Sequence, residues 1–294
     1  DTTCLIEPYL QGQESTVIVL QDAAGEPVAL VPTEIEIDRG ALFDYRRKYL
    51  PTCNTQYHTP PRFADAVVAQ IQHHAEALFR QFGMRDVARL DGWVTADGKL
   101  LFTDFNPISG MEQNSFIFQQ GSRVGFTHRS LLRHIINSAC RRYGLSLLPA
   151  PTPNTTARQP VAVVFGGATA ERQVSLMSGT NVWLKLRQSA TYAPEPYLLD
   201  KNGDVWHLPY TFTLNHSVEE IYANCRQAPT YAARLERLRA PLRQRLGLVP
   251  ADQPLALPRH LTWASFCQQA KAEGAFVFLA LHGGVGEDGT LQAQ

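Results

Sequence analysis

The sequence predicts an α/β protein of two domains, and three observations lead to this. The chain has 294 residues, which is enough for two hydrophobic cores. Apolar residues make up 44% and charged residues 18%, the balance of a globular rather than a disordered protein. Residues 147–160 (LLPAPTPNTTARQP) contain four prolines and show neither helical nor strand periodicity. We therefore predict a first domain at 1–147, a linker at 148–160 and a second domain at 161–294.

The first domain begins with segments that are typical of strands and then of a helix. Val and Ile are enriched at 15–20 and 28–37, which predicts two strands. Residues 62–82 carry apolar side chains at helical spacing along one face, so we predict an amphipathic helix there.

A hairpin and a second helix follow. Residues 87–95 and 99–105 flank Asp97-Gly98, a pair that favours tight turns, and this predicts two antiparallel strands. Farther along, Thr127 has the right chemistry for a helix N-cap, and Gly144 follows Tyr143 where a helix would end. We predict an amphipathic helix between them.

The second domain repeats one unit, in which a buried strand runs into glycines. Residues 161–165 lead into Gly166-Gly167 and a helix from about Glu171, and residues 277–281 lead into His282-Gly283-Gly284. Alternation of strands with helices predicts a parallel sheet. Residues 234–246 are strongly basic, and we predict a solvated helix there, interrupted or kinked by a proline.

Composition excludes several classes of function. The chain carries 27 basic and 27 acidic residues, so it lacks the net positive charge that nucleic acids or anionic membranes attract. Its five cysteines are widely spaced and never form a CxxC pair, which argues against a disulfide framework or a zinc site. Neither a membrane-spanning apolar run nor a signal-peptide pattern is visible. We expect a protein of the reducing cytoplasm, with no nucleic-acid or membrane partner.

Four polar residues of the predicted hairpin form the strongest local constellation. Arg89 and Asp91 alternate along one strand, and Asp104 and Asn106 alternate along the next, so all four face one side of the sheet. Carboxylate and amide oxygens suit Mg²⁺ bridged to phosphates, and an arginine can stabilise developing negative charge. Spacing alone favours a simpler alternative, a solvated sheet face with ordinary cross-strand ion pairs.

The glycines after the first strand of the second domain fit an anion site in general. Gly166-Gly167 lies between a strand and a helix, where free N–H groups point toward a ligand. The sequence FGGATAERQVS lacks the G-x-G-x-x-G pattern, so we reject dinucleotide binding.

Motifs in both domains resemble the D-alanine–D-alanine ligase family, but in reversed order. Residues 161–179 (VAVVFGGATAERQVSLMSG) and 281–291 (LHGGVGEDGTL) are similar to its N-terminal part, whereas residues 5–116 are similar to its C-terminal part. The resemblance implies an α/β fold in which an α+β ATP-grasp C-terminal portion precedes a Rossmann-like, parallel-sheet pre-ATP-grasp domain. We predict a stretch of two fused modules, with a permuted ligase as the alternative. A homodimer through the parent modules is left open.

The resemblance implies roles for the hairpin. The segment DGWVTADGKLLFTDFNPISGM is similar to the family's metal-binding segment. Asp91, Asp104 and Asn106 would then hold Mg²⁺, and Arg89 with the N–H of Gly110 would form the oxyanion site. An aspartate stands at 104 where glutamate is usual, which changes the reach of that ligand.

The resemblance also implies an ATP site. Glu7 and the backbone at Leu10 would bind the adenine edge, and Glu14 would contact the ribose. The segment FDYRRKY resembles a lid, in which Lys48 would approach the ATP phosphates and Tyr49 the substrate.

Three further residues match substrate-contacting positions of the family. Ser115 would receive the carboxylate of the second substrate, although Ser109 replaces the proline usual before the glycine. Glu171 would hold the ammonium of the first D-alanine by a charge-assisted contact, and His282 would lie near it. Gln173 stands where a second acid is common.

The family's central portion, which supplies two lysines and a serine- and glycine-rich loop for ATP, has no match here. We therefore expect these residues alone not to catalyse ligation at a measurable rate. The implied parent reaction is ATP-dependent and belongs to peptidoglycan biosynthesis, with D-alanine or a related amino or hydroxy acid as substrate. The alternatives are a non-catalytic binding module and a ligase with another second substrate, such as D-lactate.

Overall fold

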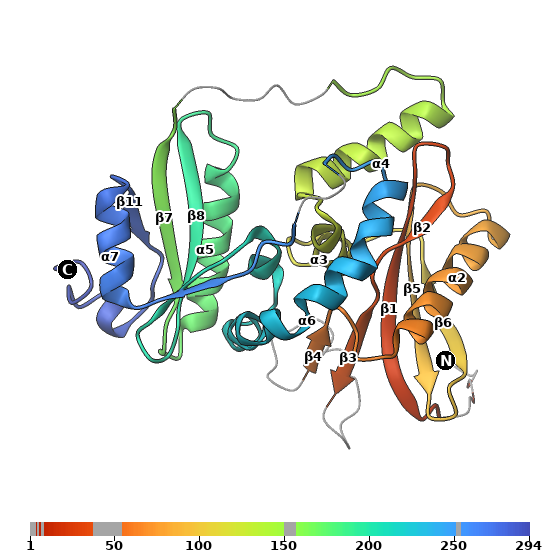
Figure 1. Ribbon diagram of the computed structural model, residues 1–294, viewed down its shortest axis with the longest axis horizontal. Helices are drawn as coiled ribbons and strands as arrows, with labels where there is room; N and C mark the ends of the chain where they lie inside the picture. Colours follow the sequence, from red (N-terminus) through yellow and green to blue (C-terminus); the bar gives the residue numbers. More distant parts are fainter. Residues whose placement is uncertain (1–3, 5, 7–8, 38–54, 150–156, 251–253) are drawn as a thin grey trace. The chain divides into compact units, whose positions relative to one another are not determined.

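The computed structural model describes residues 4, 6, 9–37, 55–149, 157–250 and 254–294, drawn in colour in Figure 1. The chain divides into two compact units. Of the described residues, the first unit contains 4, 6, 9–37, 55–148 and 234–250, and the second contains 149, 157–233 and 254–294. Segment 234–250 thus belongs to the first unit although it follows the proline-rich stretch by more than 70 residues.

The first unit is built on an antiparallel six-stranded sheet with the order β4-β3-β1-β5-β6, in which β2 also pairs with β1. Its strands are β1 (Gly12–Gln21), β2 (Pro27–Ala29), β3 (Thr33–Ile37), β4 (Thr55–His58), β5 (Val87–Thr95) and β6 (Leu100–Asn106). The strand predicted at 28–37 is therefore two strands. Three residues, 30–32, lie opposite only Val17 and Ile18 of β1, and one of the three is a proline without an N–H to donate.

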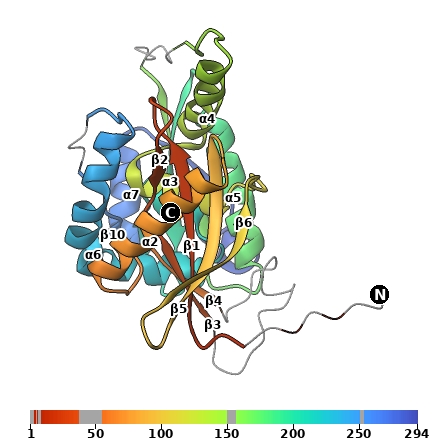
Figure 2. The same cartoon turned by 90° about the vertical axis from the view of Figure 1, so that its right-hand side faces the viewer.

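Helices cover both faces of this sheet: α2 (Asp65–Gln81), α3 (Phe116–Val124) and α4 (His128–Arg142). Helix α2, which lies across β1 in Figure 2, packs Ile71 and Phe79 against Val17 and Val19. Helix α3 lies on the other face, where the buried Gln120 amide donates to Thr33 and to the backbone of β1. The predicted helices at 62–82 and after Thr127 are confirmed, with α2 beginning only at Asp65.

The basic segment of the second half forms part of helix α6 (Val218–Arg245), which is continuous across Pro241. Two of its arginines are not solvated as predicted, since Arg239 is 3% and Arg243 1% exposed, whereas Arg237 and Arg245 are exposed. The two buried guanidiniums donate to main-chain oxygens of α3: Arg239 Nη1 lies 3.0 Å from Arg123 O, and Arg243 Nη1 lies 2.6 Å from Val124 O. The prediction of a solvated helix is wrong because these carbonyls, at the C-terminus of α3, need donors.

The second unit contains a mixed five-stranded sheet with the order β10-β9-β8-β7-β11. Its strands are β7 (Gln159–Gly166), β8 (Tyr192–Leu199), β9 (Val205–His207), β10 (Arg259–Leu261) and β11 (Phe276–Leu279). Strand β7 runs parallel to β8 and β11, which confirms the predicted parallel arrangement. Strands β9 and β10 extend the sheet in antiparallel fashion. Each has only three residues, which is too short for a periodic pattern to predict it.

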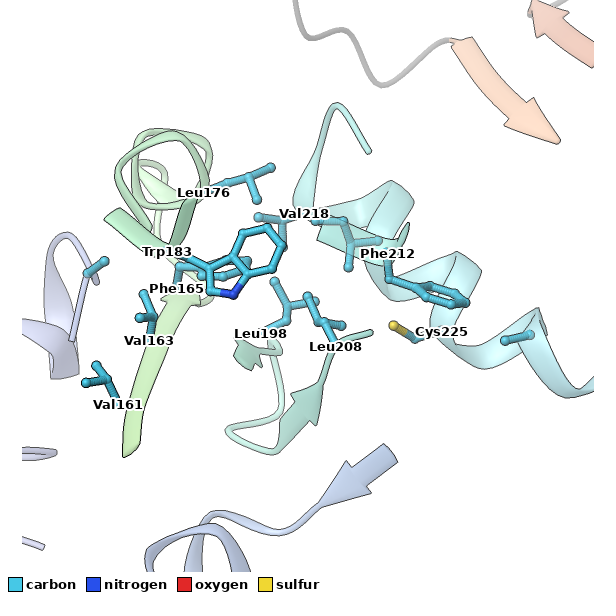
Figure 3. Close-up of a cluster of buried hydrophobic side chains, with 13 residues drawn as sticks. Val161, Val163, Phe165, Leu176, Trp183, Leu198, Leu208, Phe212, Val218 and Cys225 are labelled. Carbon is cyan, nitrogen blue, oxygen red and sulfur yellow. The ribbon is translucent and has the colours of Figure 1, made fainter. Parts of the chain in front are cut away.

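Helices α5 (Arg172–Leu186) and α7 (Trp263–Ala272) cover opposite faces of this sheet (Figure 1). On the α5 side, the indole of Trp183 is surrounded by apolar side chains from the sheet and from α6 (Figure 3). On the α7 side, Phe266 packs against Val164 and Tyr197. Short 3₁₀ turns lie at Tyr210–Leu214 and Gly284–Gly286. Each unit thus has its own core.

In the part of the chain that the structure describes, no helix has the length and apolar character needed to cross a membrane. Among the described residues, Cys140 and Cys267 are free thiols.

His134 of α4 should make the first unit less stable in mild acid. Its Nε2 lies 2.7 Å from Gln21 O, and burial lowers the pKa of the ring. The folded pKa is thus below the unfolded value of about 6.5. Stability from the neutral ring is full above that value, falls as pH drops through it, and is lost below the folded pKa. We expect the urea midpoint to fall from about pH 7.5 to 5.5, followed by circular dichroism. His134→Gln should flatten this dependence, and an unchanged slope would contradict the assignment.

Candidate functional site

The hairpin of β5 and β6 confirms the predicted placement of four polar residues. The register pairs Arg89 with Asn106 and Asp91 with Asp104, so their side chains share one face of the sheet. The pairing shifts between Asp91 and Gly92, which is a bulge of the kind found beside functional sites.

A continuous hydrogen-bond network joins these side chains. Arg89 Nε lies 3.0 Å from Asp91 Oδ1, and Arg89 Nη2 lies 2.9 Å from Asp91 Oδ2. The Asn106 amide nitrogen lies 3.2 Å from Asp91 Oδ2 and 3.1 Å from Asp104 Oδ2. Thr16 Oγ1 donates to Asp91 Oδ1 at 2.6 Å. Thr16 was not predicted to belong to the site, and only the pairing of Thr16 with Asp91 across β1 and β5 reveals it.

The residues of this network fit a divalent cation. Asp91 and Asp104 each place an oxygen within hydrogen-bond distance of the same Asn106 amide, so two carboxylates and one amide meet at one place. Oxygen ligands of this kind suit Mg²⁺. Among the described residues, no group of three or more His, Cys, Asp or Glu side chains could hold a metal ion.

Helix α3 brings a candidate anion site to the same face of the sheet. Thr33, which Gln120 of α3 contacts, is paired with Thr16 and so points to the Asp91 side. Ser115 is the N-cap residue of α3, and its Oγ is buried with no hydrogen-bond partner in the described structure. A free hydroxyl at a helix N-terminus suits a carboxylate ligand, since the first N–H groups of the helix point the same way.

The loop after β6 carries backbone strain next to a predicted oxyanion donor. Met111 has φ of 59°, a left-handed conformation that is uncommon outside glycine and clusters at functional sites. The N–H of Gly110 makes no hydrogen bond to any residue that the structure describes. A β-carbon at Gly110 would lie 2.4 Å from Glu112 Oε2, so glycine leaves room for this carboxylate. Gly110 can therefore offer its N–H to a ligand.

The predicted ATP-binding residues are described only in part. Glu14 lies on β1, half-buried, two residues before Thr16 and so on the same face of the strand. Leu10 lies half-buried just before β1. Glu7, Lys48 and Tyr49 lie outside the described residues.

In the second unit, the glycine loop after β7 is tied to the end of β11. Gly166 and Gly167 have φ of 98° and 92°, values that side chains rarely allow. The buried Ser175 hydroxyl accepts a hydrogen bond from Gly166 N at 2.8 Å and donates to Ala280 O at 2.7 Å. A β-carbon at Gly179 would lie 2.5 Å from Phe165 Cβ, so α5 approaches β7 closely. These contacts give the GG and SG steps of the motif their structural reason.

Glu171 and His282 lie at the carboxyl ends of parallel strands, where open α/β sheets bind ligands. Glu171 is the exposed N-cap residue of α5, and its Oε2 lies 3.3 Å from where a β-carbon of Gly283 would be. His282 Nε2 lies 3.3 Å from Ser178 Oγ, and Thr169 Oγ1 donates to His282 O at 2.7 Å. Ser178 was not predicted, although its spacing of seven residues from Glu171 places both on one face of α5.

Gln173 has a structural use. Its amide donates to Glu219 Oε2 at 2.6 Å and accepts from Val218 N at 3.1 Å, which joins α5 to the start of α6. Arg172 Nε also lies 2.5 Å from Glu219 Oε1. Burial alone would raise the pKa of Glu219, but the hydrogen bonds from Arg172 and Gln173 outweigh it and lower the pKa. A cavity of about 310 Å³ beside Gly167 is lined by Arg172 and Glu219.

Residues 1–137 match a family model described as D-ala D-ala ligase C-terminus, and residues 160–294 match one described as D-ala D-ala ligase N-terminus. The chain is similar to the D-alanine–D-alanine ligase of Nitratidesulfovibrio vulgaris, at 32% identity over 45% of this chain and 42% of that protein. It is also similar to the D-alanine–D-alanine ligase of Desulfotalea psychrophila, at 33% identity over 45% of this chain and 40% of that protein. The chain thus spans less than half the length of these relatives.

The solved structure of the D-alanine–D-alanine ligase from Coxiella burnetii aligns with 47% of this chain and 34% of its own. The sequence identity is 26% and the TM-score is 0.38.

Proposed function

Because this chain belongs to the D-alanine–D-alanine ligase family, we propose that it forms part of an ATP-dependent ligase that joins a carboxylate to an amine. In the proposed reaction, the carboxylate of D-alanine is phosphorylated by ATP, and the amine of a second D-alanine displaces the phosphate. The observation that carries this proposal is the network of Arg89, Asp91, Asp104 and Asn106 on one face of the β5–β6 hairpin.

The first unit would stabilise the charges that develop in this reaction. Arg89 and the N–H of Gly110 would donate to the oxyanion of the tetrahedral intermediate, where preorganised donors have their largest effect. Mg²⁺, when bound, would be held by Asp91, Asp104 and Asn106 and would neutralise phosphate charge. Asp91 has a second task here, since it holds the Arg89 guanidinium in place.

The remaining residues would bind and orient the substrates. The Ser115 hydroxyl would donate a hydrogen bond to the carboxylate of the second D-alanine. In the module that the second unit would open, Glu171 would hold the ammonium group of a first D-alanine, with His282 beside it, since both lie at the carboxyl ends of β7 and β11. Glu14 would contact the ribose of ATP.

We propose the other ATP and lid contacts from the family motifs alone. Glu7 and the backbone at Leu10 would bind the adenine edge. Lys48 would contact the phosphates, and Tyr49 the substrate.

We further propose that the chain joins two ligase modules. Residues 1–147 would close one module, 148–160 would link it to the next, and 161–294 would open the second. The order of the two family models along the chain supports this, because the C-terminal model matches first. Sequencing the gene on both sides tests it: a tandem requires an upstream GGxxAExxVS motif and a downstream lysine-bearing centre.

The activity should be tested on the full-length gene product with ATP, Mg²⁺ and D-alanine. We expect D-alanine-dependent release of ADP and a product with the mass of D-alanyl-D-alanine, and no ADP from the 294-residue chain alone. Binding of ATP and D-alanine by calorimetry without ADP release would instead identify a binding module. A product that forms only when D-lactate or another amino acid is added would show that the second substrate is not D-alanine.

Ser115→Ala should selectively weaken the binding of the second D-alanine. The hydroxyl makes no hydrogen bond to the residues that the structure describes, so its removal should leave the melting temperature unchanged. We expect KM for the second D-alanine to rise about tenfold, the value of a hydrogen bond to a charged group, while KM for ATP stays constant. A fall in thermal stability with unchanged KM would show that Ser115 has only a structural role.

A further inference from the structure

The second unit contains a cavity of about 580 Å³ at the end of its sheet opposite the loops of Gly167 and His282. It is lined by residues from the start of β8 and the last turn of α5. Helix α5 has 15 residues, so its length of about 20 Å separates this cavity from Glu171 at the other end of the helix. The cavity has the volume of a small-molecule site. The polar and aromatic residues that line it are Arg158, Trp183, Arg187, Glu195, His207, Tyr210 and Arg259.

The guanidinium of Arg187 lies over two aromatic rings of the cavity wall. Its guanidinium carbon lies 5.0 Å from the ring centre of Trp183 and 4.4 Å from that of Tyr210. Its guanidinium makes no hydrogen bond or ion pair to any residue within the described ranges, although it has five N–H donors. Burial lowers the pKa of Arg187, yet an arginine remains charged at neutral pH. A half-buried cation of this kind is stabilised by an anion that enters the cavity.

The other charged groups of the cavity leave its balance positive. Arg158 and Arg259 add two cations, and Glu195 is the one acid among the described lining residues. Glu195 is already engaged, because its Oε2 lies 3.0 Å from His207 Nε2. The other ring nitrogen of His207 lies 3.2 Å from Arg259 Nη2, so a neutral ring donates to Glu195 and accepts from Arg259. Arg187 is thus left to a ligand.

The aromatic walls indicate what accompanies the anion. Trp183 is 2% exposed and fixed in the core by its neighbours, as Figure 3 shows, so it makes the cavity wall rigid but leaves almost no ring surface for a ligand. Tyr210 lies 5.4 Å from Trp183, ring centre to ring centre, and both rings line the cavity. Flat groups stack on such rings at low entropic cost.

We propose that this cavity binds a small ligand in which a phosphate-type anion is attached to a flat ring. The planar forks of Arg187 and its neighbours would take two oxygens of the anion, and the ring would lie against the half-exposed Tyr210. The site is independent of the proposed ligase chemistry, because none of its residues belongs to the ligase motifs.

Titration calorimetry on the 294-residue chain tests this with phenyl phosphate and inorganic phosphate at matched ionic strength. We expect saturable binding at one site, with phenyl phosphate about tenfold tighter because of stacking. Arg187→Gln should weaken phenyl phosphate at least about tenfold, since it removes charge-assisted hydrogen bonds. Arg226→Gln is the matched control, because Arg226 also lies over a tyrosine ring, Tyr222, but outside the cavity. The affinity of the Arg226→Gln variant for phenyl phosphate should equal that of the unmodified protein.

A melting curve identifies any variant that fails to fold. If Arg187→Gln does not fold, the exposed Arg259 decides instead: Arg259→Gln should weaken phenyl phosphate several-fold without loss of structure. Absence of saturable binding, or equal affinity in the folded cavity variants and in Arg226→Gln, would overturn the proposal.

Discussion

Replacing Arg89 with alanine in the full-length protein should lower kcat by about 10²- to 10³-fold, the usual effect of removing one oxyanion donor. The guanidinium is held by both oxygens of Asp91, so it is oriented before substrate binds and needs no rearrangement during the reaction. KM for ATP should change little, because the effect is confined to a group that becomes charged only in the transition state. Steady-state kinetics with varied ATP and D-alanine measures both.

Two variants separate catalysis from stability. Arg80→Ala removes an exposed ion pair with Glu26 at 3.1 Å. Arg80 lies on helix α2, which covers the sheet face opposite the Arg89 network, so this change should leave kcat unchanged. Arg89→Lys keeps the charge but loses the two-pronged contact with Asp91, so it should recover only part of the rate. Equal kcat for Arg89→Ala and the unmodified enzyme, with the melting temperature preserved, would remove Arg89 from the mechanism.

The geometry of the hairpin could be predicted because it is local. Residues two apart on a strand share a face, and the turn at Asp97-Gly98 fixes which residues of β5 and β6 are paired. Glu171 and His282 were placed together by the family resemblance, and in the structure each follows a strand of the parallel pair β7 and β11. In both cases a short pattern determines where the side chain points.

Contacts between distant segments could not be predicted in this way. Thr16 reaches Asp91 only because β1 pairs with β5 across 75 residues. Helix α3 was missed because its residues Gln119, Gln120 and Arg123 are buried, which hides the amphipathic pattern. Burial of a polar side chain depends on partners elsewhere in the chain, and no sequence window contains them.

The arginines of α6 are the clearest such case. Read as sequence, 234–246 is a basic surface, but Arg239 and Arg243 each reach a carbonyl more than 110 residues away. They stabilise the C-terminus of α3, whose N-terminus carries Ser115. Helix α3 is thereby fixed at the end remote from the candidate substrate site, and a segment encoded after the linker helps to position residues encoded before it.

Arg243→Met should destabilise the first unit by about 2–4 kcal/mol. Arg243 is 1% exposed and donates to Val124 O at 2.6 Å as well as to Pro250 O, so methionine would leave two carbonyls without these donors. Urea unfolding followed by circular dichroism gives the free energy, and hydrogen exchange of the α3 amides shows where it is lost. We expect faster exchange in α3 and no change in β7 or β8.

Arg237→Met is the matched control on the same helix. Its side chain is 65% exposed and its ion pair with Asp65 spans 3.5 Å, so the loss should stay below about 1 kcal/mol. Gly125→Ala approaches the same contact from the other side: Gly125 has φ of 107°, and a β-carbon there would lie 2.1 Å from Arg243 Nη1. It should destabilise α3 even though Arg243 is retained. Equal stability of Arg243→Met and Arg237→Met would mean that Arg243 does not hold α3, and that segment 234–250 contributes to the first unit through its apolar side chains alone.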